Sequence, residues 1–319
     1  MNNFRRYFNR NRKSIWGIII IIFFFIIILQ LFNFIVKNIN EKKKEDFNNM
    51  ISKEVNNDNN VTNKKSLVSG EKVNTERLNN DTKLIKQFLD YCNNNEIENA
   101  YNLLSDSCKK EMYNNINDFS KFYYDTNFNG NKKTYSIENW SDNIYKVKII
   151  EDILSTGKSN NGESKHDYIT IIKQDNQFKL NINNYIGFKE INKTTTEKDV
   201  TINIISKNVY MDYEEYNIKV VNNTKKTILL DEGKKIDSIS VEDQNKGRHS
   251  AYTHELTEQK LIVNPLHTNN IKIKFYNGYS SNKSMEYLVF SDIVLDYDLY
   301  KQALNTDMYR DIIEIRARL

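Results

Sequence analysis

Two cysteines are the residues of this chain whose type and spacing first raise the question of chemistry. Cys92 and Cys108 lie sixteen positions apart in the stretch FLDYCNNNEIENAYNLLSDSCKKEMY. The spacing lacks the C-x-x-C pattern of a redox pair, and no histidine neighbours either residue in sequence to lower the pKa of its thiol. Two interpretations remain, a structural disulfide and two buried apolar side chains. We favour the disulfide, because both cysteines fall in one predicted domain.

The rest of the sequence contains no catalytic motif that we can identify. The histidines lack the H-E-x-x-H spacing of a zinc site, TGKSNNGES and NGYSSNKS lack the spacing of a phosphate-binding loop, and no G-x-S-x-G elbow occurs. We therefore predict no catalytic residue, no metal site and no cofactor, and we expect the protein not to be an enzyme. The histidines are His166, His249, His254 and His267.

Two segments rich in acids are the remaining candidates. IIEDIL places Glu151 and Asp152 in a predicted strand, where a buried carboxylate of raised pKa would suit proton transfer. The simpler interpretation is structural, with one of the two acids facing solvent and the other marking a β-bulge. VYMDYEEY combines acids with tyrosines, which suits cations or sugars, but a loop with packed rings explains it equally simply. Its members are Tyr210, Asp212, Tyr213, Glu214, Glu215 and Tyr216.

Periodicity predicts an α+β domain over residues 82–190. The run TKLIKQFLDYC places apolar residues on one helix face, and later segments alternate apolar and polar residues as strands do. Helices followed by a curved antiparallel sheet give an α+β unit. The alternation is clearest in Tyr145, Val147 and Ile149, and in Phe178, Leu180 and Ile182.

Opening helices of the type IKQFLDYCNNNEIENAYNLLS and a closing hairpin DNQFKLNIN resemble the nuclear transport factor 2-like fold, a cone of helices wrapped in a bent sheet. The resemblance implies a central cavity that is either open, as in an enzyme or receptor, or filled by aromatic side chains, as in a scaffold. Such domains follow a single membrane helix in scaffold proteins of bacterial conjugation and type IV secretion, and form non-catalytic stalks of some penicillin-binding proteins. We expect a filled cone, with Tyr101, Phe119, Phe122, Tyr123 and Trp140 as the filling.

The remainder of the chain changes to short strands. Residues 199–297 contain about seven alternating segments, which predict an immunoglobulin-like β-sandwich. The segment resembles extracytoplasmic accessory β-sandwiches of Gram-positive bacteria, although it lacks the Cys…Trp…Cys core. The polar stretch KEINKTTTEKD predicts a domain boundary near 188–200. Apolar residues every four positions predict a terminal helix over 298–319, namely Tyr300, Leu304, Met308 and Ile312.

The N-terminus predicts a membrane anchor. Residues 15–36 carry no formal charge, and 22 helical residues reach about 33 Å, the thickness of a hydrocarbon core. Residues 1–14 form a basic tail, which predicts a cytoplasmic N-terminus with the later domains outside the cell membrane. Residues 37–81 are polar and predict a flexible linker.

Charge and organisation together suggest a class of function. The chain has 46 basic and 42 acidic residues, and without the five cations of the tail the numbers become 41 and 42, so no nucleic-acid partner is expected. We predict a non-catalytic, single-pass, membrane-anchored scaffold or interaction protein of a bacterial cell envelope, with a transfer or secretion assembly as one setting. Its partners would be the lipid bilayer and envelope proteins. The alternative is a ligand-binding receptor or enzyme that uses the cavity of the cone.

Overall fold

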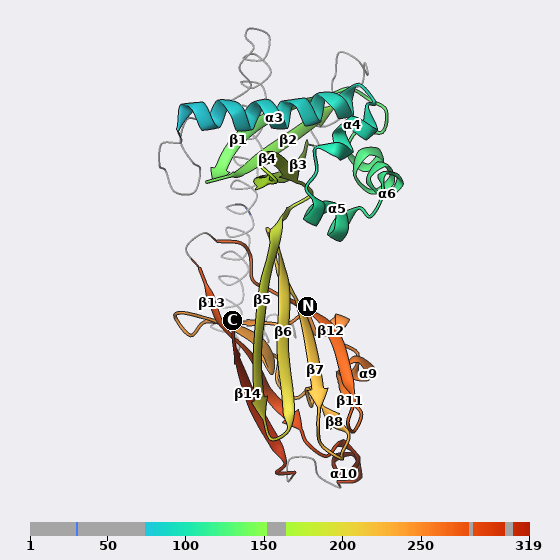
Figure 1. Ribbon diagram of the computed structural model, residues 1–319, viewed down its shortest axis with the longest axis vertical. Coiled ribbons are helices and arrows are strands. Elements are labelled where there is room, and N and C mark those ends of the chain that lie inside the picture. The colour runs from blue at the N-terminus through green and yellow to red at the C-terminus, as the bar shows by residue number, and fades with distance from the viewer. Residues whose placement is uncertain (1–29, 31–73, 152–163, 281–282, 304–308) are drawn as a thin grey trace, which may run out of the picture. The chain divides into compact units, whose positions relative to one another are not determined.

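The computed structural model describes residues 74–151, 164–280, 283–303 and 309–319, together with Gln30. These residues are mostly antiparallel β-sheet with few helices (Figure 1). From Asn74 onward they belong to one compact unit. Within it we distinguish an α+β module, residues 74–184, and a sandwich module, residues 185–319.

The α+β module opens with the amphipathic helix α3, Thr75–Asn93. The side chain of Asn74 caps it by accepting hydrogen bonds from the backbone N–H groups of Glu76 and Arg77. The predicted linker over 37–81 therefore ends earlier than expected, because its last residues are helical. Short helical segments follow: α4 (Ile97–Asn102), α5 (Asp106–Met112), α6 (Ile116–Phe119), the π-helical turn η1 (Ser120–Tyr124) and α7 (Asp125–Asn127).

A four-stranded antiparallel sheet completes the module. Its strands pair in chain order, so each connection joins neighbours. The hairpin between the last two turns through Asp175 and Asn176, both with positive φ, a conformation that Asp and Asn tolerate well. Membership of the nuclear transport factor 2-like family stays a prediction. The strands are β1 (Lys133–Ser141), β2 (Ile144–Glu151), β3 (Ser164–Gln174) and β4 (Gln177–Asn181).

Two sheets form the sandwich module, and likeness to the immunoglobulin family also stays a prediction. The first has the order β12-β7-β6-β5, and the second has the order β10-β9-β13-β8-β11 with β14 paired to β13. The first contains β5 (Tyr185–Glu197), β6 (Val200–Tyr210), β7 (Glu214–Asn222) and β12 (Thr268–Phe275). The second contains β8 (Ile228–Leu229), β9 (Ile239–Asp243), β10 (Arg248–Ser250), β11 (Ile262–Val263), β13 (Met285–Val294) and β14 (Ile312–Arg318). Short helices between strands are η2 (Thr253–Glu255), α9 (Glu258–Leu261) and α10 (Tyr297–Gln302).

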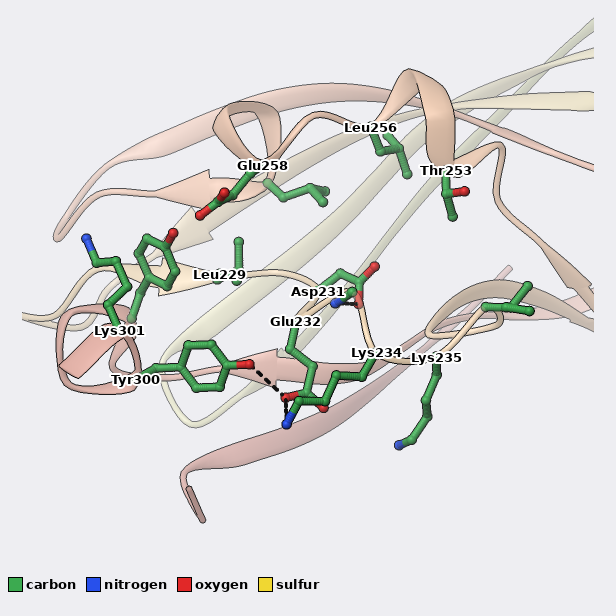
Figure 2. A pocket seen from close by; sticks show the side chains of 14 residues that line it. Leu229, Asp231, Glu232, Lys234, Lys235, Thr253, Leu256, Glu258, Tyr300 and Lys301 are labelled. Carbon is green, nitrogen blue, oxygen red and sulfur yellow. Dashed lines mark hydrogen bonds and ion pairs between the residues drawn. The ribbon is translucent and has the colours of Figure 1, made fainter. Parts of the chain in front are cut away.

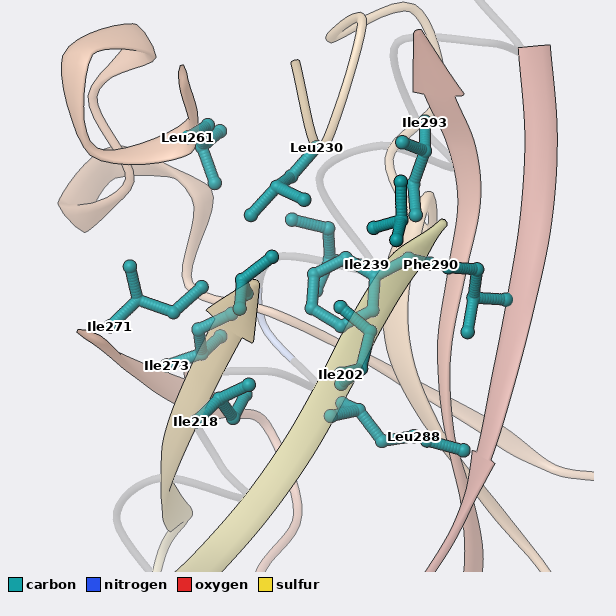
Figure 3. Packing of buried hydrophobic residues seen from close by; sticks show 14 of the residues in the cluster. Ile202, Ile218, Leu230, Ile239, Leu261, Ile271, Ile273, Leu288, Phe290 and Ile293 are labelled. Atoms are coloured by element: carbon teal, nitrogen blue, oxygen red, sulfur yellow. The ribbon is translucent and has the colours of Figure 1, made fainter. Parts of the chain in front are cut away.

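The sandwich core consists mainly of aliphatic side chains from facing strands, with a few aromatic rings among them. Ile202, Ile218 and Ile273 of the first sheet belong to the same buried cluster as Ile239 and Phe290 of the second (Figure 3). Each is at most 2% exposed. Burying a side chain of this size contributes about 1.5–3 kcal/mol, so the alternation predicted from sequence stabilises the two-sheet arrangement directly.

The predicted helix over 298–319 is wrong for most of its length. Among the described residues of this segment only α10 is helical, and β14 pairs antiparallel with β13 in a register that sets Ile315 opposite Phe290. The sequence carries two competing periods, because Ile313, Ile315 and Ala317 alternate as well. Pairing with β13 buries these three side chains, and that burial outweighs the four-residue repeat. Residues 304–308 lie outside the described chain.

The predicted domain boundary near 188–200 also needs correction. These residues form β5 and the start of β6, which pair from Tyr185 with Tyr210 to Glu197 with Val200. The polar stretch is therefore an exposed hairpin and not a spacer. A polar strand at a sheet edge has few buried side chains, so its composition resembles that of a linker.

The predicted fold class contained an N-terminal membrane helix, and this part of it is corrected. Among the described residues, no helix is long and apolar enough to cross a membrane. The longest, α3, has 19 residues and a largely polar sequence. The segment 15–36, on which the expectation rested, lies outside the described residues except for Gln30, as does the basic tail. The orientation and cell-membrane localisation inferred from them stay predictions.

Candidate functional site

Aromatic side chains fill the interior of the α+β module, where a cone-shaped domain would have its cavity. Phe88, Tyr113, Phe119 and Tyr123 are each at most 1% exposed. The Phe119 and Tyr123 rings stack with centroids 5.6 Å apart, and Phe88 and Tyr113 pack against the same two rings at 5.6–6.3 Å. Contacts at these distances leave no room between the rings for a ligand.

The residues predicted to fill this space divide into two groups. Phe119 and Tyr123 lie in the interior, and Tyr101 packs partly buried against it, 5.8 Å from the Phe119 ring. Phe122 is 56% exposed, and Trp140 is half-buried in an edge contact with Tyr168. The prediction therefore failed for Phe122 and Trp140. Phe122 belongs to η1, where the π-helical turn brings Tyr123 inward and Phe122 outward.

A buried carboxylate lies among these rings. Asp167 of β3 is 5% exposed and accepts a hydrogen bond from the hydroxyl of Tyr123 at 2.7 Å and one from the backbone N–H of Asn184 at 3.1 Å. Burial raises the pKa of Asp167 to about 6, although the hydrogen bonds oppose the shift. Asn184 has positive φ, so the carboxylate holds the tight turn that leads into β5. This geometry indicates a structural role for Asp167, because both of its carboxylate oxygens already accept hydrogen bonds from the protein.

Sequence reasoning selected a different acid of this sheet. Glu151 lies at the end of β2 and pairs with Lys133 of β1 at 3.2 Å, and Asp152 lies outside the described residues. The sequence did contain a pattern that points to Asp167 as a buried acid. Asp167 shares the inward parity of Ile169 and Ile171 on β3, so strict alternation places an acid on the buried face.

The two cysteines lie in the same core. Cys92 ends the buried face of α3, Cys108 belongs to α5, and both are free thiols at most 1% exposed. Burial raises the pKa of the Cys108 thiol to about 12, and burial raises that of Cys92 further. Thiols in this state do not act as nucleophiles or metal ligands. The structure has no bridge between them, and pairing by oxidation stays a prediction.

The strand half of VYMDYEEY forms buried and half-buried ion pairs. Glu214 accepts a hydrogen bond from the Tyr216 hydroxyl at 2.8 Å and pairs with Lys207 of β6. Glu215 pairs with Lys272 of β12 at 3.1 Å. These acids are 6% and 8% exposed, so their charges are compensated inside the sheet. This half of the motif is structural.

The turn half of the motif leads from a buried tyrosine to the surface. Tyr210 is buried and stacks on Tyr213 with centroids 4.3 Å apart, while its hydroxyl donates to Glu111 of α5 at 3.1 Å. Asp212 is exposed and forms no ion pair within the described chain. The structure therefore separates the segment at this turn and leaves Asp212 and Tyr213 available to other groups.

A pocket of about 630 Å³ lies among the β8–β9 loop, α9 and α10 of the sandwich module. Figure 2 shows Tyr300 and Lys234 converging on Glu232. The Tyr300 hydroxyl donates to Glu232 at 3.2 Å, and the Lys234 ammonium lies 3.3 Å from the same carboxylate. Leu229 and Leu256 contribute apolar surface. These three polar groups therefore satisfy one another.

The described histidines do not gather into a metal site. No group of three or more His, Cys, Asp or Glu residues in the described chain has the geometry to hold a metal ion. His249 approaches Asp243 at 3.5 Å, and His254 approaches Glu255 at 3.9 Å. Burial, followed by Lys146 and Lys148, lowers the pKa of His166. These pairings are local and involve different strands and loops.

Comparison with protein-family models, curated proteins and solved structures found no match to this chain. The candidate sites therefore stand on their own geometry.

Proposed function

We propose that this chain is a non-catalytic scaffold or interaction protein. The observation that carries the proposal is the filled interior of the α+β module, where Phe88, Phe119 and Tyr123 occupy the space that a substrate would need. A site for small molecules is concave and keeps its polar groups free to meet the ligand. Here the interior carboxylate, Asp167, is bonded to the protein itself.

The sandwich module supports the same proposal. Its core is continuous and mainly aliphatic, and polar groups such as Glu214 and Lys207 are paired within the sheet. Such a module offers a rigid surface to a partner. The alternative, a receptor or enzyme using the cone, would need the buried rings to move aside. The cell-envelope setting comes from family resemblance and stays a prediction.

Chemical cross-linking in cells that express the tagged full chain tests the proposal. We expect discrete cross-linked complexes that persist in Asp167→Asn, because the carboxylate has a structural role. They should disappear in Ile315→Asp, which places a charge in the sandwich core and serves as the misfolded control.

A screen of the purified protein for small-molecule ligands by native mass spectrometry provides the opposing outcome. Tight binding of a small molecule that Asp167→Asn abolishes, in a variant whose circular dichroism matches the parent, would contradict the proposal. It would favour the receptor or enzyme alternative.

A further inference from the structure

Three tyrosines from separate strand ends meet at the surface of the sandwich module. Tyr252 follows β10 and stacks on Tyr276, which follows β12, with centroids 3.6 Å apart and ring planes 18° apart. Tyr213, from the β6–β7 turn, meets Tyr252 edge-on at 6.1 Å. We call Tyr213, Tyr252 and Tyr276 the tyrosine patch.

Backbone pairing fixes the patch in place. The N–H of Tyr252 donates to the carbonyl of Lys274 at 2.8 Å, and the N–H of Tyr276 donates to the carbonyl of Ser250 at 3.0 Å. These bonds join the end of β10 to the end of β12, next to the bridge between Ala251 and Phe275. The rings are therefore ordered before any partner arrives, which lowers the entropic cost of binding.

The outer ring of the patch is open to solvent. Tyr276 is 53% exposed, whereas Tyr213 and Tyr252 are half-buried beneath and beside it. Exposed, preorganised tyrosines are unusual on a surface without a partner, because aromatic rings are concentrated in interfaces.

Carboxylates surround the patch. Burial raises the pKa of Tyr252 first, and Tyr276, Asp212 and Glu255 raise it further. Burial is also the main cause of the raised pKa of Tyr213, and Glu215 raises that pKa further. Glu215 and Glu255 are paired with Lys272 and Lys274, whereas Asp212 forms no ion pair within the described chain. Asp212 therefore leaves a negative charge beside the patch that a cation would neutralise.

The chain already shows how a cation binds here. The ammonium of Lys274 lies 5.5 Å from the centroid of the Tyr213 ring and 3.1 Å from Glu255. An aromatic face and a carboxylate thus hold one cation between them. Tyr276 offers a second aromatic face, stacked on Tyr252, and Asp212 acts electrostatically on Tyr252. Within the described chain, no lysine or arginine lies over the Tyr276 ring or pairs with Asp212.

We propose that the tyrosine patch, with Asp212, binds an exposed arginine- or lysine-bearing segment of a partner protein. The inference rests on the proposed function and names the chemistry of the partner. Cation–π contact with Tyr276 and attraction to Asp212 would hold the basic side chain, and the ring stack would supply apolar contact to its stem. Nucleic acid is disfavoured, because carboxylates around the patch repel phosphates.

Fluorescence anisotropy with the purified full chain and a labelled peptide of alternating arginine and glycine tests the proposal. We expect binding that weakens with added salt. Tyr276→Ala should weaken it about twofold to thirtyfold, the range of cation–π contacts, and Tyr276→Phe should retain it. Asp212→Asn should also weaken it. Phe178→Ala is the matched control, since Phe178 is 56% exposed on β4 of the other module.

The same peptide with citrulline in place of arginine separates charge from shape. Equal binding of the citrulline peptide, or binding unaffected by Tyr276→Ala, would overturn the inference. Complexes cross-linked in cells that survive Tyr276→Ala together with Asp212→Asn would also overturn it, while leaving the proposed function intact. Complexes absent even from the parent chain would count against the proposed function itself.

Discussion

At the scale of single residues, the buried carboxylates of the α+β module each have a hydrogen-bond partner. Asp167 is the clearest case, because its oxygens bind the Tyr123 hydroxyl and the backbone of the turn before β5. Tyr145 of β2 behaves similarly on the same face of the sheet, where its hydroxyl donates to Asp81 of α3 at 2.8 Å. Each bond satisfies a group whose unpaired burial would cost about 1–3 kcal/mol.

The carboxylate of Asp167 should make stability depend on pH. Its pKa rises from 3.8 to about 6 on folding, so the folded state binds the proton more strongly than the unfolded state. The contribution of this group to stability is therefore greatest below about pH 4 and falls as pH rises through about 6. The loss amounts to about 3 kcal/mol in order of magnitude.

Urea unfolding at pH 4.5 and pH 7 measures this effect, with Asp167→Asn as the comparison. When the pH falls from 7 to 4.5, the unfolding free energy of the parent should rise more, or fall less, than that of the variant. An identical pH dependence in both proteins would show that Asp167 does not carry the effect.

The cysteines should react slowly in the folded protein. Burial holds the pKa of Cys108 near 12 and that of Cys92 higher, so little thiolate exists at pH 8 and access is blocked. Iodoacetamide should label both at least about a thousandfold more slowly than in urea. Labelling of protein that is purified without reductant and then denatured tests for a disulfide. If the cysteines do not react under these conditions, they form a bridge.

At the scale of elements, β14 shows how a terminal segment completes the sandwich. It pairs with β13 and contributes Ile313, Ile315 and Ala317 to the core, while Glu314 and Arg316 point to the other side. Without β14, the long strand β13 would lose its hydrogen-bonded neighbour along most of its length, and the core would lose three buried side chains.

Substitution within β14 should reveal this role. Ile315→Ala removes a side chain that is 1% exposed, so it should lower the unfolding free energy by about 2–5 kcal/mol. The neighbouring Glu314→Ala lies on the exposed side and should change it by less than about 0.5 kcal/mol. Denaturant unfolding of both variants measures the contrast. Equal small effects would mean that β14 does not belong to the cooperative core.

At the scale of the whole described unit, the two modules share residues and are not joined by a spacer. Tyr185 and Tyr210, paired at the start of β5 and the end of β6, belong to the core of the α+β module. The backbone N–H of Met211 donates to the carbonyl of Asn184 at 2.9 Å, and Glu111 of α5 lies 3.6 Å from Lys272 of β12. Several strand ends therefore hold the junction together.

Limited digestion with trypsin tests this continuity. Lys189 and Lys193 are exposed, but their backbones belong to β5, whose pairing with β6 keeps them out of a protease cleft. We expect no early cleavage at either residue in the native protein and rapid cleavage at both in urea. Early native fragments ending at Lys189 or Lys193 would restore the interpretation of two domains with a linker between them.

The sequence by itself determined those local features that depend only on residues close together in the chain. Apolar spacing placed α3, and strict alternation placed strands such as β2, β6 and β12, because a side chain's face follows from its position in a helix or strand. The alternation along β3 also contained a signal for the buried Asp167, which sequence reasoning missed because it selected Glu151 and Asp152. The tyrosines and acids of VYMDYEEY were identified as a group before their partners were known.

The tertiary structure alone decided everything that depends on residues distant in sequence. The C-terminal segment carries both a four-residue and a two-residue period, and only the presence of β13 beside it selected the strand. β5 resembles a linker in composition, and only its pairing with β6 made it part of a sheet. Tyr213, Tyr252 and Tyr276 are separated by dozens of residues. Backbone hydrogen bonds between the ends of β10 and β12 bring Tyr252 and Tyr276 together, and the pairing of β7 with β12 adds Tyr213. Long-range pairing adds free energy that local patterns do not contain, so a sequence window could not predict these outcomes.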